Sequence, residues 1–324
     1  MKKKIVLYGT FTPQMLALLK DNCPTDFDVY HVNKNEDLSL LAPADYMICR
    51  AVSINHTILD TAVNLKAIQK WGVGYDKIDI ADAGARGIPV MISLGGNSIP
   101  VAELTVALML DVLRHISTLN TRLKSGIWAR EEFASQTYML HGKTVGLVGI
   151  GHIAKEVAKI VHDGFNCKVL YYDIAPLDKD EERRLKVHSV SLKELMSLSD
   201  IVSVHIPLLE STRKLIDYKL LNLMKPTACL INTSRGGVIN EDDLIAILKE
   251  KRILGAGLDT FCEEPVPPDA PILAFDDVVV TPHCGGNTND NDQNMANICM
   301  TNILQYDQHH NKGMESIVNY DYLQ

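Results

Sequence analysis

Three residues far apart in the sequence have the side chains needed for acid–base chemistry on a small carboxylic acid. Arg235, Glu264 and His283 each come shortly after an apolar run typical of a β-strand. An arginine can hold a carboxylate, a histidine can donate a proton, and a glutamate beside that histidine can stabilise its protonated form. These are the groups that a 2-oxo acid requires when a hydride is added to its carbonyl carbon.

A glycine turn in the middle of the chain has the spacing of a nucleotide-binding loop. Gly149-Ile150-Gly151-His152-Ile153-Ala154 follows an apolar run, and apolar residues recur after it at helical spacing. In such a turn Gly149 permits the tight bend, Gly151 lets the backbone approach a pyrophosphate, and the small Ala154 lets the helix pack against the strand. The phosphates then lie at the amino end of a helix, where backbone N–H groups point outward.

Asp173 indicates which dinucleotide this turn binds. It ends the next predicted strand, 168–173, where its carboxylate can accept hydrogen bonds from the adenosine ribose hydroxyls. The same charge would repel the 2′-phosphate of NADP, and the following Ile174 and Ala175 bring no arginine to bind that phosphate. The sequence therefore predicts NAD as the cofactor.

Two series of strand-like runs are available to position these groups, and both alternate with helical stretches. The first series comprises 5–9, 29–32, 46–50, 65–70 and 89–93, and the second comprises 144–149, 168–173, 201–206, 228–233, 255–259 and 278–282. Between them lie a break at 93–100 and a long apolar helix at 101–115, which together look like a hinge. This alternation predicts an α/β fold with two parallel sheets.

The order of the elements predicts two domains, one inserted into the other. We expect residues 99–287 to form an NAD-binding domain of the Rossmann type. Residues 1–98 form a smaller parallel unit of the Rossmann-like or flavodoxin-like kind, and the tail at 288–324 is predicted to return to it. Together these two segments would be the substrate-binding domain. The 324 residues are enough for two such domains.

Composition and cysteine usage argue against several other classes of protein. The net charge is −8 and no basic run occurs, which disfavours a nucleic acid or an anionic membrane as partner. The sequence contains no run of about 18 apolar residues, so no membrane span is predicted. Seven cysteines, an odd number without CxxC spacing, indicate a reduced, cytoplasmic protein. Without that spacing or an HExxH pair, no metal site is predicted.

Six motifs, taken in order, resemble those of the D-isomer-specific 2-hydroxyacid dehydrogenases over roughly residues 65–290. They are Gly72-Val73-Gly74-Tyr75-Asp76, the stretch from Asn97 to Glu103, the glycine turn, Thr233-Ser234-Arg235-Gly236-Gly237, Leu258-Asp259 with Glu263-Glu264-Pro265, and Thr281-Pro282-His283. The resemblance implies two domains that close over cofactor and substrate, and a homodimer. It also implies reversible hydride transfer between NADH and a small 2-oxo acid.

The resemblance further implies roles for individual residues. Arg235 matches the arginine that holds the substrate, His283 the catalytic histidine, and Glu264 the acid paired with it. The backbone N–H groups of Val73 and Gly74 match those that bind the substrate carboxylate, and Arg50 is a further substrate-binding candidate. Positions expected to bind the cofactor are Thr105, Gly149, Gly151, His152, Ile153, Asp173, Ile206, Pro207, Thr212, Thr233, Ser234 and Asp259, the last by orienting the nicotinamide carboxamide.

Two other functions stay open at this point. D-3-phosphoglycerate dehydrogenases share these motifs, but Val52 stands where they carry a second arginine beside the one matching Arg50, which favours a substrate without phosphate. An NAD-sensing binding protein, like the corepressors of this fold, can retain the same three catalytic residues. Near these motifs, His205 is expected to be structural and Cys284 a small filler. Trp71 either caps the substrate pocket or fills the space between the domains.

Overall fold

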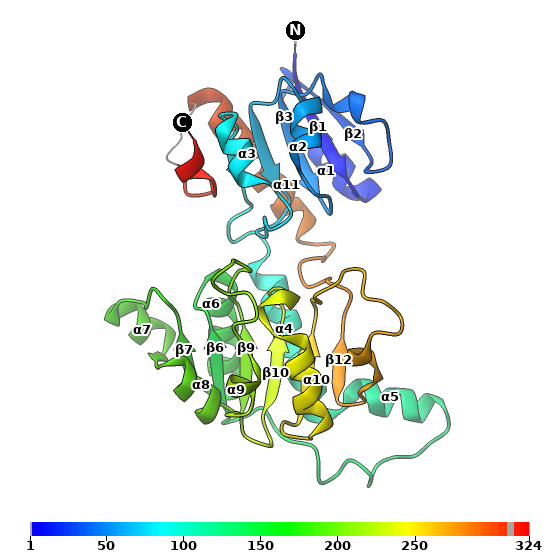
Figure 1. Ribbon diagram of the computed structural model, residues 1–324, viewed down its shortest axis with the longest axis vertical. Helices are drawn as coiled ribbons and strands as arrows, with labels where there is room; N and C mark the ends of the chain where they lie inside the picture. The colour runs from blue at the N-terminus through cyan, green and yellow to red at the C-terminus, as the bar shows by residue number, and fades with distance from the viewer. Residues whose placement is uncertain (1, 310–313, 324) are drawn as a thin grey trace. The chain divides into compact units, whose positions relative to one another are not determined.

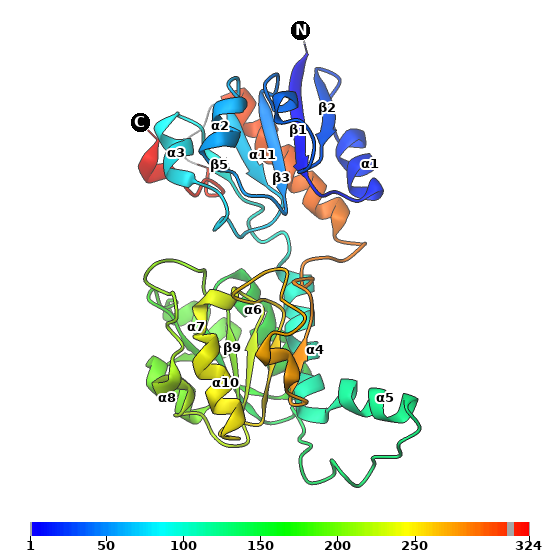
Figure 2. The ribbon, with the colours of Figure 1, turned by 45° about the vertical axis from the view of Figure 1, so that its right-hand side comes forward.

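Two parallel β-sheets organise the chain, one in each of two units (Figure 1, Figure 2). The computed structural model describes residues 2–309 and 314–323. Unit 1 consists of Met1–Asn97 and Asn287–Gln324, and unit 2 consists of Ser98–Gly286. Unit 2 is therefore inserted into unit 1.

The sheet of unit 1 is parallel throughout and has the strand order β2-β1-β3-β4-β5. Its strands are β1 (Lys3–Gly9), β2 (Phe27–Val32), β3 (Tyr46–Arg50), β4 (Ala67–Lys70) and β5 (Val90–Met91). The helices of the unit are α1 (Pro13–Asp21), α2 (His56–Thr61), α3 (Ile80–Ala85) and α11 (Asp292–His309), with 3₁₀ turns η1 (Leu38–Leu41) and η5 (Tyr320–Tyr322).

Both faces of this sheet are covered, which explains why the central strands β1 and β3 are mostly buried and apolar. In β1, Ile5 and Leu7 pack in the core that includes residues of α1 and α11. The alternate residues Val6 and Tyr8 pack on the opposite face, in the core that includes residues of α2 and α3. The return of α11 thus closes one face of a sheet that the first residues of the chain begin.

The sheet of unit 2 is also parallel and has the strand order β12-β11-β10-β9-β6-β7-β8. Its strands are β6 (Thr144–Val148), β7 (Lys168–Tyr172), β8 (Val187–Ser189), β9 (Ile201–Val204), β10 (Cys229–Asn232), β11 (Gly255–Leu258) and β12 (Val278–Val280). Its helices are α4 (Ser98–Arg114), α5 (Ile116–Lys124), α6 (His152–Lys159) followed by the π turn η2 (Ile160–Gly164), α7 (Lys179–Leu185), α8 (Leu192–Leu198), α9 (Tyr218–Leu221) and α10 (Glu241–Lys249), with 3₁₀ turns η3 (Gly236–Val238) and η4 (Pro271–Ala274).

The strand order of unit 2 reverses at β6, which pairs with β7 on one side and β9 on the other. Helices α4 and α6 contribute to the core on one face of the sheet, and α8, α9 and α10 to the core on the other. In a doubly wound sheet, the connections from the two central strands leave in opposite directions, which opens a crevice at their carboxyl ends. The glycine turn that follows β6 lies at this crevice.

The predicted α/β class with two parallel sheets is confirmed, and the differences concern single elements. Strand β8 was not predicted, because it has only three residues at the sheet edge and buries only Val187. The predicted strand 201–206 ends at Val204, and the predicted strand 89–93 shortens to Val90–Met91. Short edge pairings depend on contacts between distant segments, which local apolar patterns do not encode.

The long helix α4 begins at Ser98, three residues before the predicted start. Pro100 lies in its first turn, where a missing N–H removes no intrahelical hydrogen bond, so this proline does not delay the helix. Within residues 2–309 and 314–323, no helix is both long and apolar enough to cross a lipid bilayer.

Candidate active site

Three predicted residues follow neighbouring strands at one edge of the unit 2 sheet. Strands β10, β11 and β12 are adjacent and parallel, and Arg235, Glu264 and His283 come after their respective carboxyl ends. His283 Nδ1 and Glu264 Oε2 lie 2.9 Å apart, within hydrogen-bond distance. Their side chains are 42% and 23% exposed, so a ligand can reach the pair. Because Glu264 engages Nδ1, Nε2 is the nitrogen that can exchange a proton with a ligand.

Asp259 fixes the loop that carries His283. Its carboxylate is buried and accepts three hydrogen bonds, from the Thr281 hydroxyl (2.7 Å) and from the backbone N–H groups of Cys284 (2.9 Å) and Gly285 (2.9 Å). His283 lies between these donors with φ of 50°, a left-handed conformation that is strained for a residue with a Cβ. Since the donors lie on both sides of His283, Asp259 can hold this strained backbone in place.

A side chain at the end of β10 shapes the turn that presents Arg235. Asn232 is buried, and its Oδ1 accepts hydrogen bonds from the backbone N–H (3.0 Å) and the hydroxyl (2.7 Å) of Ser234. Its Nδ2 donates to the Arg235 carbonyl (3.0 Å). Asn232 therefore satisfies polar groups throughout the turn and sets where the arginine leaves the sheet.

Gly236 brings the Arg235 turn against the loop that carries Glu264. A Cβ at this position would lie only 2.0 Å from the carbonyl carbon of Phe261 and 2.4 Å from the nitrogen of Cys262. Only glycine allows this approach of backbone to backbone. The Phe261 N–H in turn donates to Glu264 Oε1 (3.2 Å). The close packing of these two loops therefore helps to place both side chains.

The glycine turn after β6 has the geometry that a pyrophosphate requires. Gly149 has φ of 97°, and a Cβ there would lie 2.8 Å from Ile206 Cγ2 and 3.0 Å from the His205 backbone. Gly151 caps α6 and has no neighbouring atom within 4 Å of an added Cβ, so its backbone is open. His152 is exposed and Ile153 half-buried. A bound dinucleotide would meet the free N–H groups of the helix start here.

Asp173 supports the same turn from the end of β7. Its Oδ2 accepts a hydrogen bond from the Ile150 N–H (2.9 Å), and its Oδ1 accepts one from the Ala175 N–H (2.9 Å). The sequence-based interpretation gave Asp173 a role toward the ribose only. In the structure it also holds the middle of the glycine turn, so the ribose-binding candidate and the phosphate-binding candidate are directly connected.

The remaining cofactor candidates lie on loops beyond β9 and β10 and on α4. Thr212 closes the loop after β9, because its hydroxyl donates to the Pro207 carbonyl (2.6 Å) and accepts from the Leu209 N–H (2.8 Å). Thr105 is fully buried in α4, and its hydroxyl lies 2.9 Å from that of Thr233. Thr105 therefore supports Thr233 from behind and offers no accessible surface to a cofactor.

His205, at the end of β9, lies beside the glycine turn. Burial lowers the pKa of this histidine to about 4, so its ring is neutral near pH 7. Its Nε2 lies 2.9 Å from the Ser203 hydroxyl. A neutral, half-buried ring cannot supply a proton at neutral pH, which separates His205 from the exposed His283.

The substrate candidates of unit 1 follow β3 and β4. The loop with Val73 and Gly74 begins at Gly72, which has φ of 121°. Ser93 is buried beneath it: its N–H donates to the Gly72 carbonyl (2.9 Å) and its hydroxyl donates to the Lys70 carbonyl (2.9 Å). This serine therefore ties the loop to the segment that follows β5.

Arg50 and Trp71 stand at neighbouring strand ends in the same unit. The Arg50 guanidinium donates to the Thr10 carbonyl (2.7 Å) and to Asn287 Oδ1 (3.1 Å). Trp71 is buried and packs edge-on against Phe11, with ring centroids 5.9 Å apart. In unit 1 the tryptophan is thus part of the core, and its contact with Phe11 gives the strand ends an aromatic support.

Comparisons with known proteins identify the family. A family model described as the NAD binding domain of D-isomer specific 2-hydroxyacid dehydrogenases matches residues 106–285. The chain belongs to this family. The glyoxylate reductase of Thermofilum pendens is 38% identical over 305 residues, which cover 89% of this chain and 87% of that protein. As a family member, the chain is an oxidoreductase that acts on the CH–OH group of 2-hydroxy acids.

Solved structures of 2-hydroxyacid dehydrogenases share the whole fold. The D-mandelate dehydrogenase of Rhodotorula graminis superposes with a TM-score of 0.83 at 28% identity, covering 94% of this chain and 95% of that one. The NADPH-dependent glyoxylate/hydroxypyruvate reductase of Sinorhizobium meliloti superposes with a TM-score of 0.84 at 25% identity, over 100% of both chains. The family thus includes a structure named for NADPH, so membership of the 2-hydroxyacid dehydrogenases does not by itself distinguish NAD from NADP.

Two supporting residues of this 2-hydroxyacid dehydrogenase were missed by the sequence-based analysis. Asn232 and Ser93 are polar residues that come directly after apolar runs, and this position in the sequence could have indicated their role. Buried polar side chains at strand ends require hydrogen-bond partners and therefore often order the adjoining loop.

Within the described part of the chain, no group of three or more His, Cys, Asp or Glu side chains could hold a metal ion.

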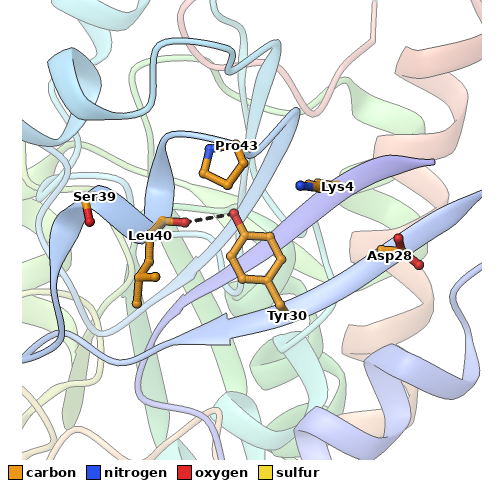
Figure 3. A pocket seen from close by; sticks show the side chains of 6 residues that line it. All are labelled: Lys4, Asp28, Tyr30, Ser39, Leu40 and Pro43. Carbon is orange, nitrogen blue, oxygen red and sulfur yellow. Dashed lines mark hydrogen bonds between the residues drawn. The ribbon is translucent and has the colours of Figure 1, made fainter. Parts of the chain in front are cut away.

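A surface pocket of about 280 Å³ on unit 1 lies away from these residues (Figure 3). It is lined by Lys4, Asp28, Tyr30, Ser39, Leu40 and Pro43. Lys4 and Asp28 stand near the amino ends of β1 and β2, whereas Arg50 is the last residue of β3 and Val73 follows β4. The Tyr30 hydroxyl donates to the Leu40 carbonyl (3.0 Å) and is therefore already satisfied. The pocket and the substrate candidates therefore lie at opposite ends of these strands.

Proposed function

We propose that this 2-hydroxyacid dehydrogenase reversibly reduces a small 2-oxo acid, of the size of glyoxylate or hydroxypyruvate, with NADH. The observation that carries the proposal is the 2.9 Å contact between Glu264 and His283, at the sheet edge that also presents Arg235. The names of two similar proteins, a glyoxylate reductase and a glyoxylate/hydroxypyruvate reductase, support a substrate of this size.

In this proposal the side chains divide the work of reduction. The glycine turn would hold NADH, which would supply the hydride. Arg235 and the N–H groups of Val73 and Gly74 hold the substrate carboxylate, and Arg235 also polarises the ketone. His283 donates the proton on Nε2 to the oxygen as negative charge develops there. Glu264, as a carboxylate, stabilises the protonated ring before the transfer. In oxidation the neutral His283 accepts the proton instead.

The proposal assigns the cofactor to unit 2 and the substrate side chain to unit 1. The match of the NAD-binding family model to residues 106–285, which lie within unit 2, supports the first assignment. The strand-end position of Arg50 and of the Val73–Gly74 loop supports the second. On this basis unit 1, with residues 1–98 and 288–324 as the expected bounds, is the substrate-binding domain, and 99–287 is the cofactor domain.

We propose NAD in preference to NADP because of Asp173. Its carboxylate is held by the N–H groups of Ile150 and Ala175, so it cannot easily turn away from a cofactor bound at the glycine turn. A 2′-phosphate would then be placed against a fixed like charge. Some relatives use NADPH, and a direct comparison of NADH with NADPH is therefore part of the test.

We propose that a second copy of this chain covers the segment 116–139. Helix α5 buries none of its residues and extends from the rest of unit 2 (Figure 1, Figure 2). Large apolar side chains are exposed along the segment, namely Ile116, Leu123, Ile127, Trp128 and Met139, and Trp128 is 78% exposed. An apolar arm of this kind is typical of a homodimer interface.

The oligomeric state tests the dimer. The parent chain should sediment as a dimer, and Leu123→Glu should shift it toward the monomer. Leu198→Glu is the matched control, because Leu198 is equally apolar and half exposed but lies on α8 of the same unit. A monomeric parent chain would refute the proposed dimer.

We also propose a reducing, cytoplasmic location, since all seven cysteines are free.

The main test is turnover on a panel of 2-oxo acids with NADH. Glyoxylate, hydroxypyruvate, pyruvate and a branched 2-oxo acid should be reduced, and the product should be the D isomer where it is chiral. Phosphohydroxypyruvate should have a lower kcat/KM than hydroxypyruvate, because phosphate binding needs more charge-assisted contacts than Arg50 alone supplies. If no member of the panel is reduced while NADH binds, the chain is a binding protein. If phosphohydroxypyruvate is the best substrate, the proposed substrate class is wrong.

A further inference from the structure

Gln69 is a fully buried amide in strand β4. It points to the same side of the sheet as Ala67, which packs in the core that includes residues of α11. Its Oε1 accepts a hydrogen bond from Asn302 Nδ2 on α11 (3.0 Å), and its Nε2 donates to the Lys70 carbonyl (2.8 Å) and to the Ser93 hydroxyl (3.2 Å). Both polar atoms of the amide are therefore satisfied within unit 1.

The hydrogen bonds of Gln69 lead to the start of the Val73–Gly74 loop. The Lys70 carbonyl, at the end of β4, accepts from Gln69 Nε2 and also from the Ser93 hydroxyl (2.9 Å). The Ser93 N–H donates to the Gly72 carbonyl (2.9 Å), and its hydroxyl oxygen lies 3.5 Å from the Gly72 nitrogen. One buried network therefore holds the backbone immediately before Val73.

Helix α11 completes this network from the other side. Asn302 Nδ2 donates to the Ile92 carbonyl (3.2 Å) as well as to Gln69. Strands β4 and β5 are adjacent and parallel, with Gln69 opposite Met91. The groups that Gln69 and Asn302 join thus lie at the carboxyl ends of these two strands, where the Val73–Gly74 loop begins.

The Val73 and Gly74 N–H groups are available to a ligand. Both residues are half-buried, and in the described part of the chain neither N–H donates to another protein group. Two N–H groups of this kind can bind a carboxylate only if their peptide planes are oriented toward it, because a hydrogen bond weakens steeply when donor and acceptor are misaligned. The backbone just before them sets that orientation.

Stability alone does not require a polar network at this place. An apolar pair of similar shape is often as stable as two buried, hydrogen-bonded amides, because the desolvation of the amides offsets much of what their hydrogen bonds contribute. A satisfied network adds a fixed direction for the groups that it contacts. Here those groups are the Lys70 carbonyl and, through Ser93, the peptide groups of Gly72.

We propose that Gln69 is a positioning residue for the substrate carboxylate. Through Lys70 and Ser93 it fixes the direction of the Val73 and Gly74 N–H groups, and Asn302 holds the Gln69 amide in turn. This inference rests on the proposed function and adds to it the buried residues that prepare the carboxylate site.

The experiment compares Gln69→Met with the parent, using the full chain, NADH, and glyoxylate and hydroxypyruvate as substrates. Methionine keeps the length of the side chain and removes both polar atoms. KM for both acids should rise by the same factor, on the order of tenfold, because both present the same carboxylate and a hydrogen bond to a charged group contributes about that much to affinity. The kcat and the Kd of NADH should change by less than about twofold, since substrate and transition state lose the same contact.

Asn302→Leu tests the network itself, and Asn319→Leu is its matched control. Asn302→Leu should raise KM as Gln69→Met does, and the double variant should raise it no further. Asn319 is also a buried asparagine of unit 1, but it donates to the Ile88 carbonyl (2.9 Å) and accepts from the Val90 N–H (2.8 Å), at the amino end of β5. Asn319→Leu should lower Tm without raising KM.

The outcomes separate this inference from the proposed function. If the parent chain reduces neither acid, the proposed function fails. If the parent is active but Gln69→Met lowers only Tm, or Asn319→Leu raises KM equally, Gln69 has a structural role and the inference is refuted. A rise in KM for hydroxypyruvate alone would also refute it, because glyoxylate has the carboxylate but no side chain. Should Gln69→Met not fold, Ser93→Ala, which removes only the hydroxyl between Gln69 and Lys70, must show the same rise in KM.

Discussion

The hydrogen bonds to Asp259 predict that this residue sets the activity of His283. In Asp259→Asn the amide oxygen can still accept from the Thr281 hydroxyl and the Cys284 N–H, but the amide nitrogen then faces the Gly285 N–H. One charge-assisted hydrogen bond is lost and two donors oppose each other. Such a bond contributes about 1.5–3 kcal/mol, so we expect the loop to be weakened by about 2–3 kcal/mol.

This weakening acts on a strained backbone. His283 has φ of 50°, and the left-handed conformation costs a residue with a Cβ roughly 1–2 kcal/mol. A loss of about 2–3 kcal/mol allows the loop to relax into other conformations and can lower the population of the active one by up to on the order of a hundredfold. We therefore expect kcat to fall by tens of fold up to about a hundredfold, because 1.4 kcal/mol corresponds to a factor of ten.

The assay measures kcat for hydroxypyruvate reduction together with the Kd of NADH from fluorescence titration. Thr281→Val removes one of the three hydrogen bonds with little change of shape, and its loss of kcat should be smaller than that of Asp259→Asn. If Asp259 acts mainly on the nicotinamide carboxamide, the Kd of NADH will rise as strongly as kcat falls. That result, or a kcat within threefold of the parent, would refute the positioning role.

Three further predictions concern the choice of cofactor, the role of His205 and the stability that Asp307 contributes. The parent should favour NADH over NADPH by on the order of a hundredfold in kcat/KM, and Asp173→Ala should narrow this gap mainly by weakening NADH, because the Ile150 N–H also loses its acceptor. Equal use of both cofactors by the parent would contradict this. Because burial holds the pKa of His205 at about 4, His205→Gln should not move the pH profile of kcat between pH 6 and 9, and a displaced profile would show that His205 takes part in proton transfer. Burial alone would raise the pKa of Asp307, but hydrogen bonds from Lys3 and Tyr46 outweigh it and hold the pKa below its ordinary value. A lowered folded-state pKa contributes stability above the unfolded pKa that is lost as the pH falls, so Asp307→Asn should lower Tm by a few degrees at pH 7 and by progressively less below about pH 4; a difference independent of pH would contradict this.

Local patterns in the sequence predicted most of the strands and the glycine turn, because buried parallel strands are apolar runs and a tight turn at a helix start requires glycine. They did not predict β8, whose pairing with β7 depends on a segment brought back by α7. They also did not predict the anchoring of the turns by Asn232 and Asp259. Those hydrogen bonds join residues whose proximity arises only when the sheet has formed.

The candidate site shows the same division. His283 and Glu264 were predicted from residue type and position after strands, and the structure places their side chains 2.9 Å apart. Thr105 was expected to contact the cofactor, but it is fully buried behind Thr233. Matching a position to a family motif does not reveal whether the side chain faces the ligand or the core, because that depends on how α4 packs against β10.

The pH dependence of Glu264→Gln tests the central claim most directly. Glu264→Gln removes the negative charge that lies 2.9 Å from His283 Nδ1 and that favours the protonated ring. Reduction requires the protonated ring, and the reductive activity of Glu264→Gln should therefore fade at a lower pH than that of the parent, while its oxidative activity extends toward acid. Glu263→Gln, an exposed neighbour, should leave both profiles in place. A reductive profile of Glu264→Gln that stays in place or moves toward alkali would contradict the pairing of Glu264 with His283.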